Sequence, residues 1–159
     1  MFLSFPSYDV LPLKFSPLFA WISLVPLFIY IRNKDMKRVF LISFITGLIG
    51  NYLIYRWIGQ FGAQIPGGRI IILIFLIPYL SVFFSMKIIV SEYIARKYES
   101  LRFLIYPFCW LIIDSIQSIG FLAFPWPYWG YSQYSFLPIV QSASIIGLFG
   151  ITFFIILFN

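Results

Sequence analysis

Long apolar segments alternate with short polar runs along this chain, and five such segments stand out. None of them alternates between apolar and polar residues, as a strand of about ten residues in an outer-membrane barrel would. A bilayer core roughly 30 Å thick is crossed by about 20 helical residues. The pattern therefore predicts an all-α membrane protein, a bundle of about five transmembrane helices, near residues 15–31, 39–55, 70–90, 103–121 and 139–158.

Residues 1–159 are predicted to form a single transmembrane domain, because only short loops join the segments. Pro78 lies inside the third segment, where it removes a backbone donor and predicts a kink. Lys87 lies further along the same segment, and its long side chain is predicted to snorkel to the membrane interface.

The basic residues indicate how the helices cross the membrane. Residues 32–38 contain four Lys or Arg, and Arg96, Lys97 and Arg102 lie between the third and fourth segments. Loops rich in Lys and Arg stay on the cytoplasmic side. We therefore expect these two loops to be cytoplasmic, and the loops at residues 56–69 and 122–138 to face outward.

This topology places the first residues of the chain outside, although they contain no signal peptide. Asp9 is the first charge and Lys14 the first basic residue, so the basic start of a signal peptide is missing. At the other end, Asn159 follows an apolar run without a basic flank. The sequence therefore predicts truncation at both ends, with Met1-Phe2-Leu3 as the tail of an earlier helix.

Composition supports a membrane protein and excludes several other classes. The chain is 62% hydrophobic and only 10% charged, whereas a soluble domain carries about 25% charged residues. Its net charge of +6 sits in short runs between apolar segments, which argues against a nucleic-acid surface. There is no His and Cys109 is the single cysteine, so we expect no disulfide, no metal site and no cofactor.

The outer loop from residue 124 to residue 136 is the most unusual stretch, because seven of its thirteen residues are aromatic. Trp and Tyr favour the headgroup level of a membrane, so the loop could be an interfacial belt. Two prolines and a glycine also give it a defined backbone path. The loop could equally be a platform that contacts lipid.

One motif in this loop resembles a known family. Phe124-Pro125-Trp126, three variable residues and Gly130-Tyr131-Ser132-Gln133 resemble the outer loop before the sixth membrane helix of apolipoprotein N-acyltransferases. Three further stretches resemble segments of that family and occur in the same order. They are residues 5–12, Phe61-Gly62 followed by Pro66, and Pro107-Phe108-Cys109-Trp110.

The resemblance implies the N-terminal membrane region of an enzyme of the bacterial inner membrane. That family moves an acyl chain from a phospholipid to a cysteine, and then to the α-amino group of a lipoprotein's diacylglyceryl-cysteine. The resemblance implies membrane phospholipid and a diacylated lipoprotein as partners. It also implies a nitrilase-like domain with a Glu-Lys-Cys triad, and that domain is missing here. We therefore expect no catalytic residue in this chain, and we interpret Cys109, in an apolar helix, as a small buried residue.

Two charged residues outside the loop each allow two interpretations. Arg56, beside Trp57, is either an interfacial anchor or a partner for a phospholipid phosphate. Asp114 lies within an apolar helix, where a carboxylate is costly. It is either a polar clamp with Gln117 or Ser118, or part of a substrate-side network. The family usually has Glu near this position followed by Arg-Gly, and Gln117-Ser118 replaces that pair.

The predicted substrate- or lipid-binding residues are thus Phe124, Pro125, Trp126, Gly130, Tyr131, Gln133, Arg56 and Asp114. We expect the fragment to supply membrane anchoring and access for lipid and substrate. The alternatives are a small transporter, for which Asp114 and Pro78 are the available signals, and a noncatalytic scaffold subunit of a membrane complex.

Overall fold

The computed structural model describes Phe5 and residues 17–159, and this part of the chain contains helices and no strand, which confirms the all-α prediction. Apart from Phe5, the motif at residues 5–12 and the predictions for Met1-Phe2-Leu3, Asp9 and Lys14 lie outside the described residues. The α-helices are α1 (Val25–Ile31), α2 (Met36–Tyr55), α3 (Gly68–Lys97), α4 (Arg102–Gln117) and α5 (Leu137–Phe158). Four 3-10 helices join them: η2 (Pro17–Trp21), η3 (Arg56–Gly62), η4 (Glu99–Leu101) and η5 (Trp129–Gln133).

Three stretches are long and apolar enough to cross a membrane: Met36–Gly62, Gly68–Lys97 and Leu137–Phe158. The other two predicted segments are shorter as helices. The described part of the first one, Pro17–Ile31, is interrupted between η2 and α1. The fourth one, α4, ends at Gln117 instead of Phe121, because Gly120 adopts a left-handed φ of 94° and turns the chain.

The interruption between η2 and α1 leaves backbone groups without helical partners, and distant side chains satisfy them. Asn159 accepts a hydrogen bond from the Leu24 N–H at 2.7 Å and donates one to the Ala20 carbonyl at 2.7 Å. Irregular backbone is tolerated at membrane depth only where the protein satisfies it in this way. The end of α5 therefore holds the start of α1 in place.

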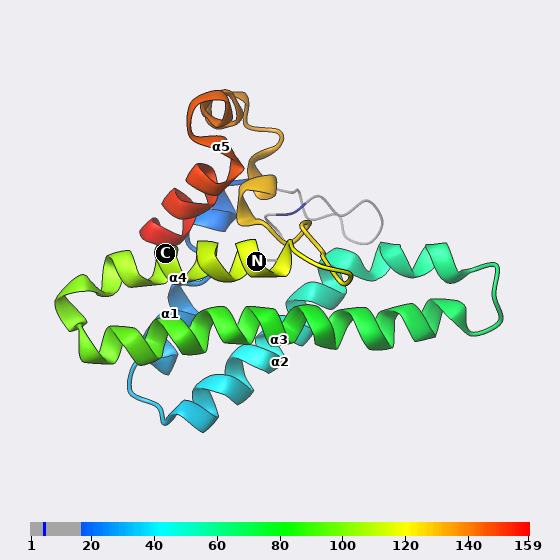
Figure 1. Ribbon diagram of the computed structural model, residues 1–159, viewed down its shortest axis with the longest axis horizontal. Helices are drawn as coiled ribbons and strands as arrows, with labels where there is room; N and C mark the ends of the chain where they lie inside the picture. Colours follow the sequence, from blue (N-terminus) through cyan, green and yellow to red (C-terminus); the bar gives the residue numbers. More distant parts are fainter. Residues whose placement is uncertain (1–4, 6–16) are drawn as a thin grey trace.

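Figure 1 shows α3, the longest helix, lying along the long axis of the molecule. It packs against α2 and α4, and α4 packs against α5. Helix α3 continues through Pro78 as a single helix. The clear change of direction lies in α5, at Gly147, whose φ of 67° and ψ of 176° are not helical.

The helices expose apolar side chains, and they bury polar side chains as well as apolar ones between them. Large hydrophobic side chains such as Phe75 and Ile145 are exposed, whereas Ser81, Ser85 and Glu92 of α3 are completely buried. Ser81 accepts a hydrogen bond from Asn51 Nδ2 of α2 at 3.3 Å. Association of helices in lipid depends on such small and polar contacts, since lipid offers no hydrophobic driving force.

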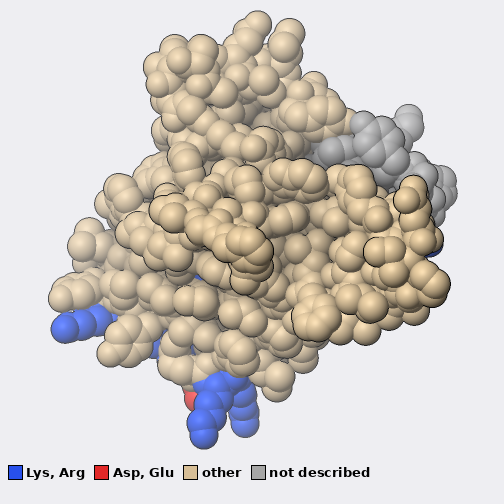
Figure 2. All heavy atoms as spheres, turned by 45° about the vertical axis from the view of Figure 1, so that its right-hand side comes forward, with Lys and Arg blue, Asp and Glu red and all other residues tan. Residues whose placement is uncertain are grey.

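The basic loops gather at one end of the molecule. The α1–α2 connection and the α3–α4 connection meet there, because Arg96 Nη2 donates to the Lys34 carbonyl at 2.5 Å. Figure 2 shows Lys and Arg along the lower edge of the molecule, while the rest of that face is almost free of charge. Residues 32–38 and 96–102 thus lie on the same side, as the loop assignment requires.

Candidate functional site

An aromatic cluster lies at the end of the helices opposite the basic loops, and Trp57 and Trp126 form its exposed part. Their rings stack 5.6 Å apart with an angle of 10° between the planes, and both remain nearly half exposed. Phe124 packs against Trp126 at 5.3 Å and against Tyr55 at 5.7 Å. We call Tyr55, Trp57, Phe124 and Trp126 the aromatic platform.

Hydrogen bonds fix the loop that carries this platform. Tyr55 Oη donates to the Trp126 carbonyl at 3.2 Å, and the Phe124 N–H donates to the Gln117 carbonyl at the end of α4 at 3.0 Å. Tyr79 Oη donates to the Leu122 carbonyl at 2.7 Å. Helices α2, α3 and α4 therefore all hold the loop, and Trp126 is presented by a fixed backbone.

Gln133 lies inside the protein, whereas a residue that contacts lipid would be exposed. Its side chain is completely buried. The amide nitrogen donates to the Pro17 carbonyl at 2.9 Å and to Ser132 Oγ at 2.8 Å, and the amide oxygen accepts from Trp21 Nε1 at 3.2 Å. Gln133 thus connects η5 to η2 and acts by positioning the loop.

Gly130 allows η5 to lie directly against α5. Its N–H donates to Thr152 Oγ1 at 3.0 Å. A Cβ on Gly130 would lie 2.5 Å from Leu148 Cδ1 and 2.9 Å from the Leu148 carbonyl oxygen. The second distance involves backbone, which cannot move aside as a side chain can.

We expect Gly130→Ala to destabilise the protein by about 1–3 kcal/mol, because the added methyl group overpacks this contact. The midpoint of unfolding by dodecyl sulfate in mixed micelles, followed by circular dichroism, measures the change. Gly130 itself has no left-handed φ, so the cost reports the close contact and not backbone strain. An unfolding midpoint equal to that of the native protein would mean that the steric argument is wrong.

The remaining predicted loop residues and Arg56 lie around the platform. Tyr131 is 44% exposed and stacks on Tyr128 at 5.9 Å, and Pro125 is exposed between two platform residues. Arg56 is half-buried where α2 passes into η3, next to Trp57. Within the described residues its side chain has no ion pair, so its guanidinium can bind an anion.

Asp114 has a partner that the sequence did not indicate. Lys87 Nζ of α3 lies 2.5 Å from Asp114 Oδ1, and the two side chains are 3% and 0% exposed. Lys87 also donates to Gln117 Oε1 at 3.3 Å and lies 5.5 Å from the Trp110 ring centre. The prediction that Lys87 snorkels to the interface is therefore wrong, because a buried carboxylate attracts its ammonium group inward.

Lys87 connects Asp114 to Gln117, whereas Ser118 does not contact Lys87. Ser118 Oγ donates to the Ser115 carbonyl instead, at 2.7 Å. Among the described residues, Asp114 Oδ2 and Gln117 Nε2 have no hydrogen-bond partner. This polar cluster (Lys87, Asp114, Gln117) reaches the platform through a small cavity of about 10 Å³ that Lys87 and Tyr55 both line, which has room for about one water molecule.

Cys109 is buried on α4 and carries a free thiol. Its thiol has Ser91 of α3 as a hydrogen-bonding neighbour, and the described residues contain no group of three His, Cys, Asp or Glu side chains that could hold a metal ion. Its surroundings suit a small packing residue.

A second polar cluster, at the basic end, was not predicted. Glu92 is completely buried, and its carboxylate accepts from Arg96 Nε at 2.8 Å, Arg102 Nη1 at 2.5 Å and Tyr106 Oη at 2.6 Å. Glu92 lies one helical turn before Arg96, and that spacing was the available signal. The cluster joins α3 to α4 beneath the basic loops.

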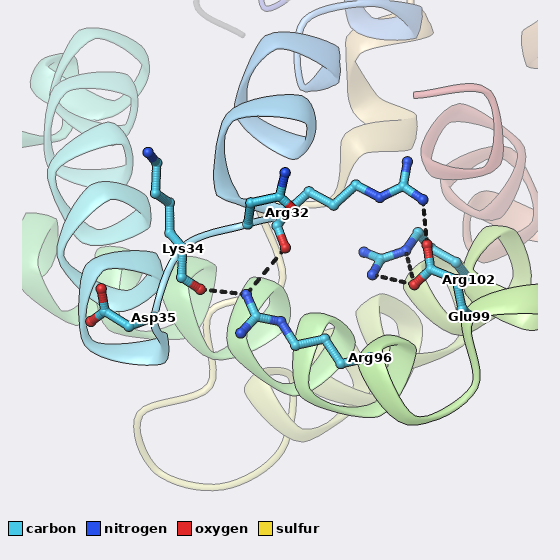
Figure 3. Close-up of a pocket in the computed structure, with 7 residues that line it drawn as sticks. Arg32, Lys34, Asp35, Arg96, Glu99 and Arg102 are labelled. Atoms are coloured by element: carbon cyan, nitrogen blue, oxygen red, sulfur yellow. Dashed lines mark hydrogen bonds and ion pairs between the residues drawn. The ribbon is translucent and has the colours of Figure 1, made fainter.

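Above Glu92, an open pocket of about 620 Å³ lies between the two basic loops (Figure 3). Glu99 contacts both Arg102, at 2.7 Å, and Arg32. Hydrogen bonding from Arg102, with a further contribution from Arg32, lowers the pKa of Glu99. The pocket is lined by Arg32, Asn33, Lys34, Asp35, Arg96, Glu99 and Arg102.

Comparison with known proteins gives matches along the whole chain. Residues 1–159 match the family model described as apolipoprotein N-acyltransferase N-terminal domain. The chain is 32% identical to an apolipoprotein N-acyltransferase of Geobacter metallireducens over 167 positions, which cover 99% of this chain and 30% of that protein. It is 31% identical to apolipoprotein N-acyltransferase 1 of Treponema denticola, covering 99% of this chain and 27% of that protein.

A relative with the same name in Pasteurella multocida is 24% identical, covering 90% of this chain and 28% of that protein. No solved structure gives a significant match. The chain thus spans 30% or less of the length of these three relatives.

Proposed function

Because the chain belongs to the family of apolipoprotein N-acyltransferase N-terminal domains, we propose that it is the membrane part of a lipoprotein N-acyltransferase of the bacterial inner membrane. The complete enzyme would transfer an acyl chain from phospholipid to the α-amino group of a lipoprotein's N-terminal diacylglyceryl-cysteine. In this proposal the chain supplies anchoring and access for lipid and substrate. The nucleophile comes from a nitrilase-like domain outside it.

The aromatic platform is the observation that carries this proposal. Trp57 and Trp126 are stacked, exposed and held by a fixed backbone, at the end of the helices where the loop of residues 122–138 has no charge. Flat aromatic surfaces at the headgroup level contact both acyl chains and polar headgroups. Arg56, adjacent to Trp57, offers a guanidinium to a phosphate.

The predicted binding residues divide into two groups under this proposal. Phe124, Pro125, Trp126, Tyr131 and Arg56 are accessible or half-accessible and would contact lipid or substrate. Gly130 and Gln133 are buried and would hold the loop in place. Asp114 would stabilise the helices beneath the platform through Lys87.

A transporter is the alternative that the buried Lys87–Asp114 pair favours, since paired ionisable residues within membrane helices often mark ion pathways. An ion pathway also needs water or a polar channel on both sides of the pair. Both side chains are almost completely buried, and the adjoining cavity has room for about one water molecule. The pair is therefore better explained as a clamp between α3 and α4.

We expect Trp126→Ala to lower acyl transfer about three- to tenfold, because it removes a ring stack worth about 0.5–1.5 kcal/mol and part of the contact surface. The full product of the gene would be expressed in a host depleted of its own N-acyltransferase. Mass spectrometry of lipoprotein N-termini then measures the fraction that carries a third acyl chain.

Tyr93→Ala is the matched control, because Tyr93 is 70% exposed on α3 and lies outside the platform. Membrane insertion of all variants is checked by immunoblot. Unchanged acyl transfer in correctly inserted Trp126→Ala would mean that the loop is only an interfacial belt. A third acyl chain produced by residues 1–159 alone would place a nucleophile in this chain and return attention to Cys109.

A further inference from the structure

The pocket at the basic end has an excess of positive charge. Seven of the eleven Lys and Arg residues of the chain lie in residues 32–38 and 96–102, whereas the carboxylates near them are Asp35, Glu92 and Glu99. Four of the seven basic residues line the pocket itself: Arg32, Lys34, Arg96 and Arg102. An anion entering the pocket therefore meets a net positive field.

Arg32 and Lys34 have donors to spare. The Arg32 side chain is 58% exposed and contacts Glu99 through Nη2, and a guanidinium has five N–H donors. Lys34 Nζ lies 5.0 Å from the centre of the Tyr30 ring and forms no ion pair within the described residues. Arg96, in contrast, uses its donors on Glu92 and on backbone carbonyls.

An apolar groove continues from this pocket along the helices. It has a volume of about 420 Å³ and shares Arg32, Glu99 and Arg102 with the basic pocket. Its remaining surface comes mainly from apolar residues of α1, α4 and α5, and aromatic rings line part of it. These residues are Val25, Phe28, Ile29, Phe103, Tyr106, Ile156 and Leu157.

We propose that the basic pocket and the groove together bind one anionic phospholipid of the leaflet at this end. Arg32, which lines both the pocket and the groove, would hold the phosphodiester, since Arg matches phosphate oxygens in a bidentate geometry, and Lys34 would add to the positive charge around it. One acyl chain would lie along Val25, Phe28 and Phe103. Basic pockets between membrane helices are suited to anionic headgroups.

This site lies at the opposite end of the helices from the aromatic platform, so it is separate from the proposed acyl transfer. In the topology expected from the basic loops it faces the cytoplasmic leaflet. A lipid there would fill the space between α1 and α4 and bind the two basic loops together. Its role would be to stabilise the bundle.

The test measures lipid retained by the full product of the gene, purified in mild detergent, by native mass spectrometry. We expect one molecule of phosphatidylglycerol to be retained in preference to phosphatidylcholine. We expect Arg32→Gln to weaken phosphatidylglycerol binding about fivefold, the equivalent of about 1 kcal/mol for one basic residue. Lys34→Gln provides a second, independent variant.

Lys37→Gln is the matched control, because it removes the same charge from an exposed residue of the same loop that does not line the pocket. Equal loss in Arg32→Gln and Lys37→Gln would indicate only a diffuse positive surface and would overturn the site. Equal retention of phosphatidylglycerol and phosphatidylcholine would do so as well.

The groove is tested by Val25→Trp, which should fill it and reduce retention of phosphatidylglycerol at least fivefold, whereas Ile22→Trp, outside the groove, should not. If Val25→Trp retains lipid normally, the groove holds something else, such as a later segment of the same protein, and the proposal fails. Inorganic phosphate should not displace the lipid at millimolar concentration. Displacement would show a site for free anions.

Discussion

Asp114→Ala is expected to lower the free energy of unfolding by about 3–5 kcal/mol, one of the two largest effects we predict for this chain. The substitution leaves the Lys87 ammonium group 3% exposed and without its carboxylate, 2.5 Å away in the native protein. Breaking a buried ion pair on one side is costly because an uncompensated charge stays in a medium of low dielectric constant. Gln117 offers Lys87 only a neutral oxygen.

The measurement is unfolding by dodecyl sulfate in mixed micelles, followed by circular dichroism. Ser115→Ala serves as the control, because Ser115 is the next residue on α4 but is exposed. The double variant Lys87→Met, Asp114→Leu should recover most of the loss, since an apolar pair of similar size often replaces a buried ion pair without cost. A stable Asp114→Ala single variant would mean that water or lipid already shares this pair.

Glu92→Gln is expected to cost about 2–3 kcal/mol, since hydrogen bonds to charged groups contribute about 1.5–3 kcal/mol each and the two arginines can partly turn to water. The glutamine keeps the volume of Glu92 but loses the charge that Arg96 and Arg102 both contact. Its amide nitrogen would also point a donor at another donor. The same unfolding assay measures this loss.

Glu99→Gln is the control for Glu92→Gln, because Glu99 contacts the same Arg102 but is half exposed. Pairs at the surface contribute little, so we expect almost no change. Equal effects of the two substitutions would argue that Glu99 holds Arg102, and that Glu92 does not hold α3 and α4 together.

The sequence was sufficient for the helical class, for the gathering of basic loops at one end and for an aromatic loop away from them. These features depend on residues that are close in sequence, namely the length of each apolar segment and the positions of Lys and Arg beside it. The interruption between η2 and α1 could not be predicted from the sequence. Asn159 bonds the backbone at the interruption and Gln133 bonds the backbone at the start of η2, and both residues are more than 100 positions away in sequence.

The polar clusters were missed for the same reason. Lys87 and Asp114 lie on different helices, and their pairing depends on how α3 is rotated and shifted against α4. Hydropathy averages over a whole segment and contains no such information. Trp126 and Gln133 were singled out together from one motif, yet only the fold separates the exposed ring from the buried amide.

The break at Gly147 divides α5 into two halves that are packed differently. None of residues 137–150 in this described helix is buried, whereas Ile151, Thr152, Ile155 and Ile156 are packed in the core. Backbone hydrogen bonds between successive turns make a continuous helix rigid, and the non-helical glycine interrupts them. The half of α5 after Gly147 is therefore fixed in the core, whereas the half before it contacts the core through partly buried residues such as Ile139 and Ala143.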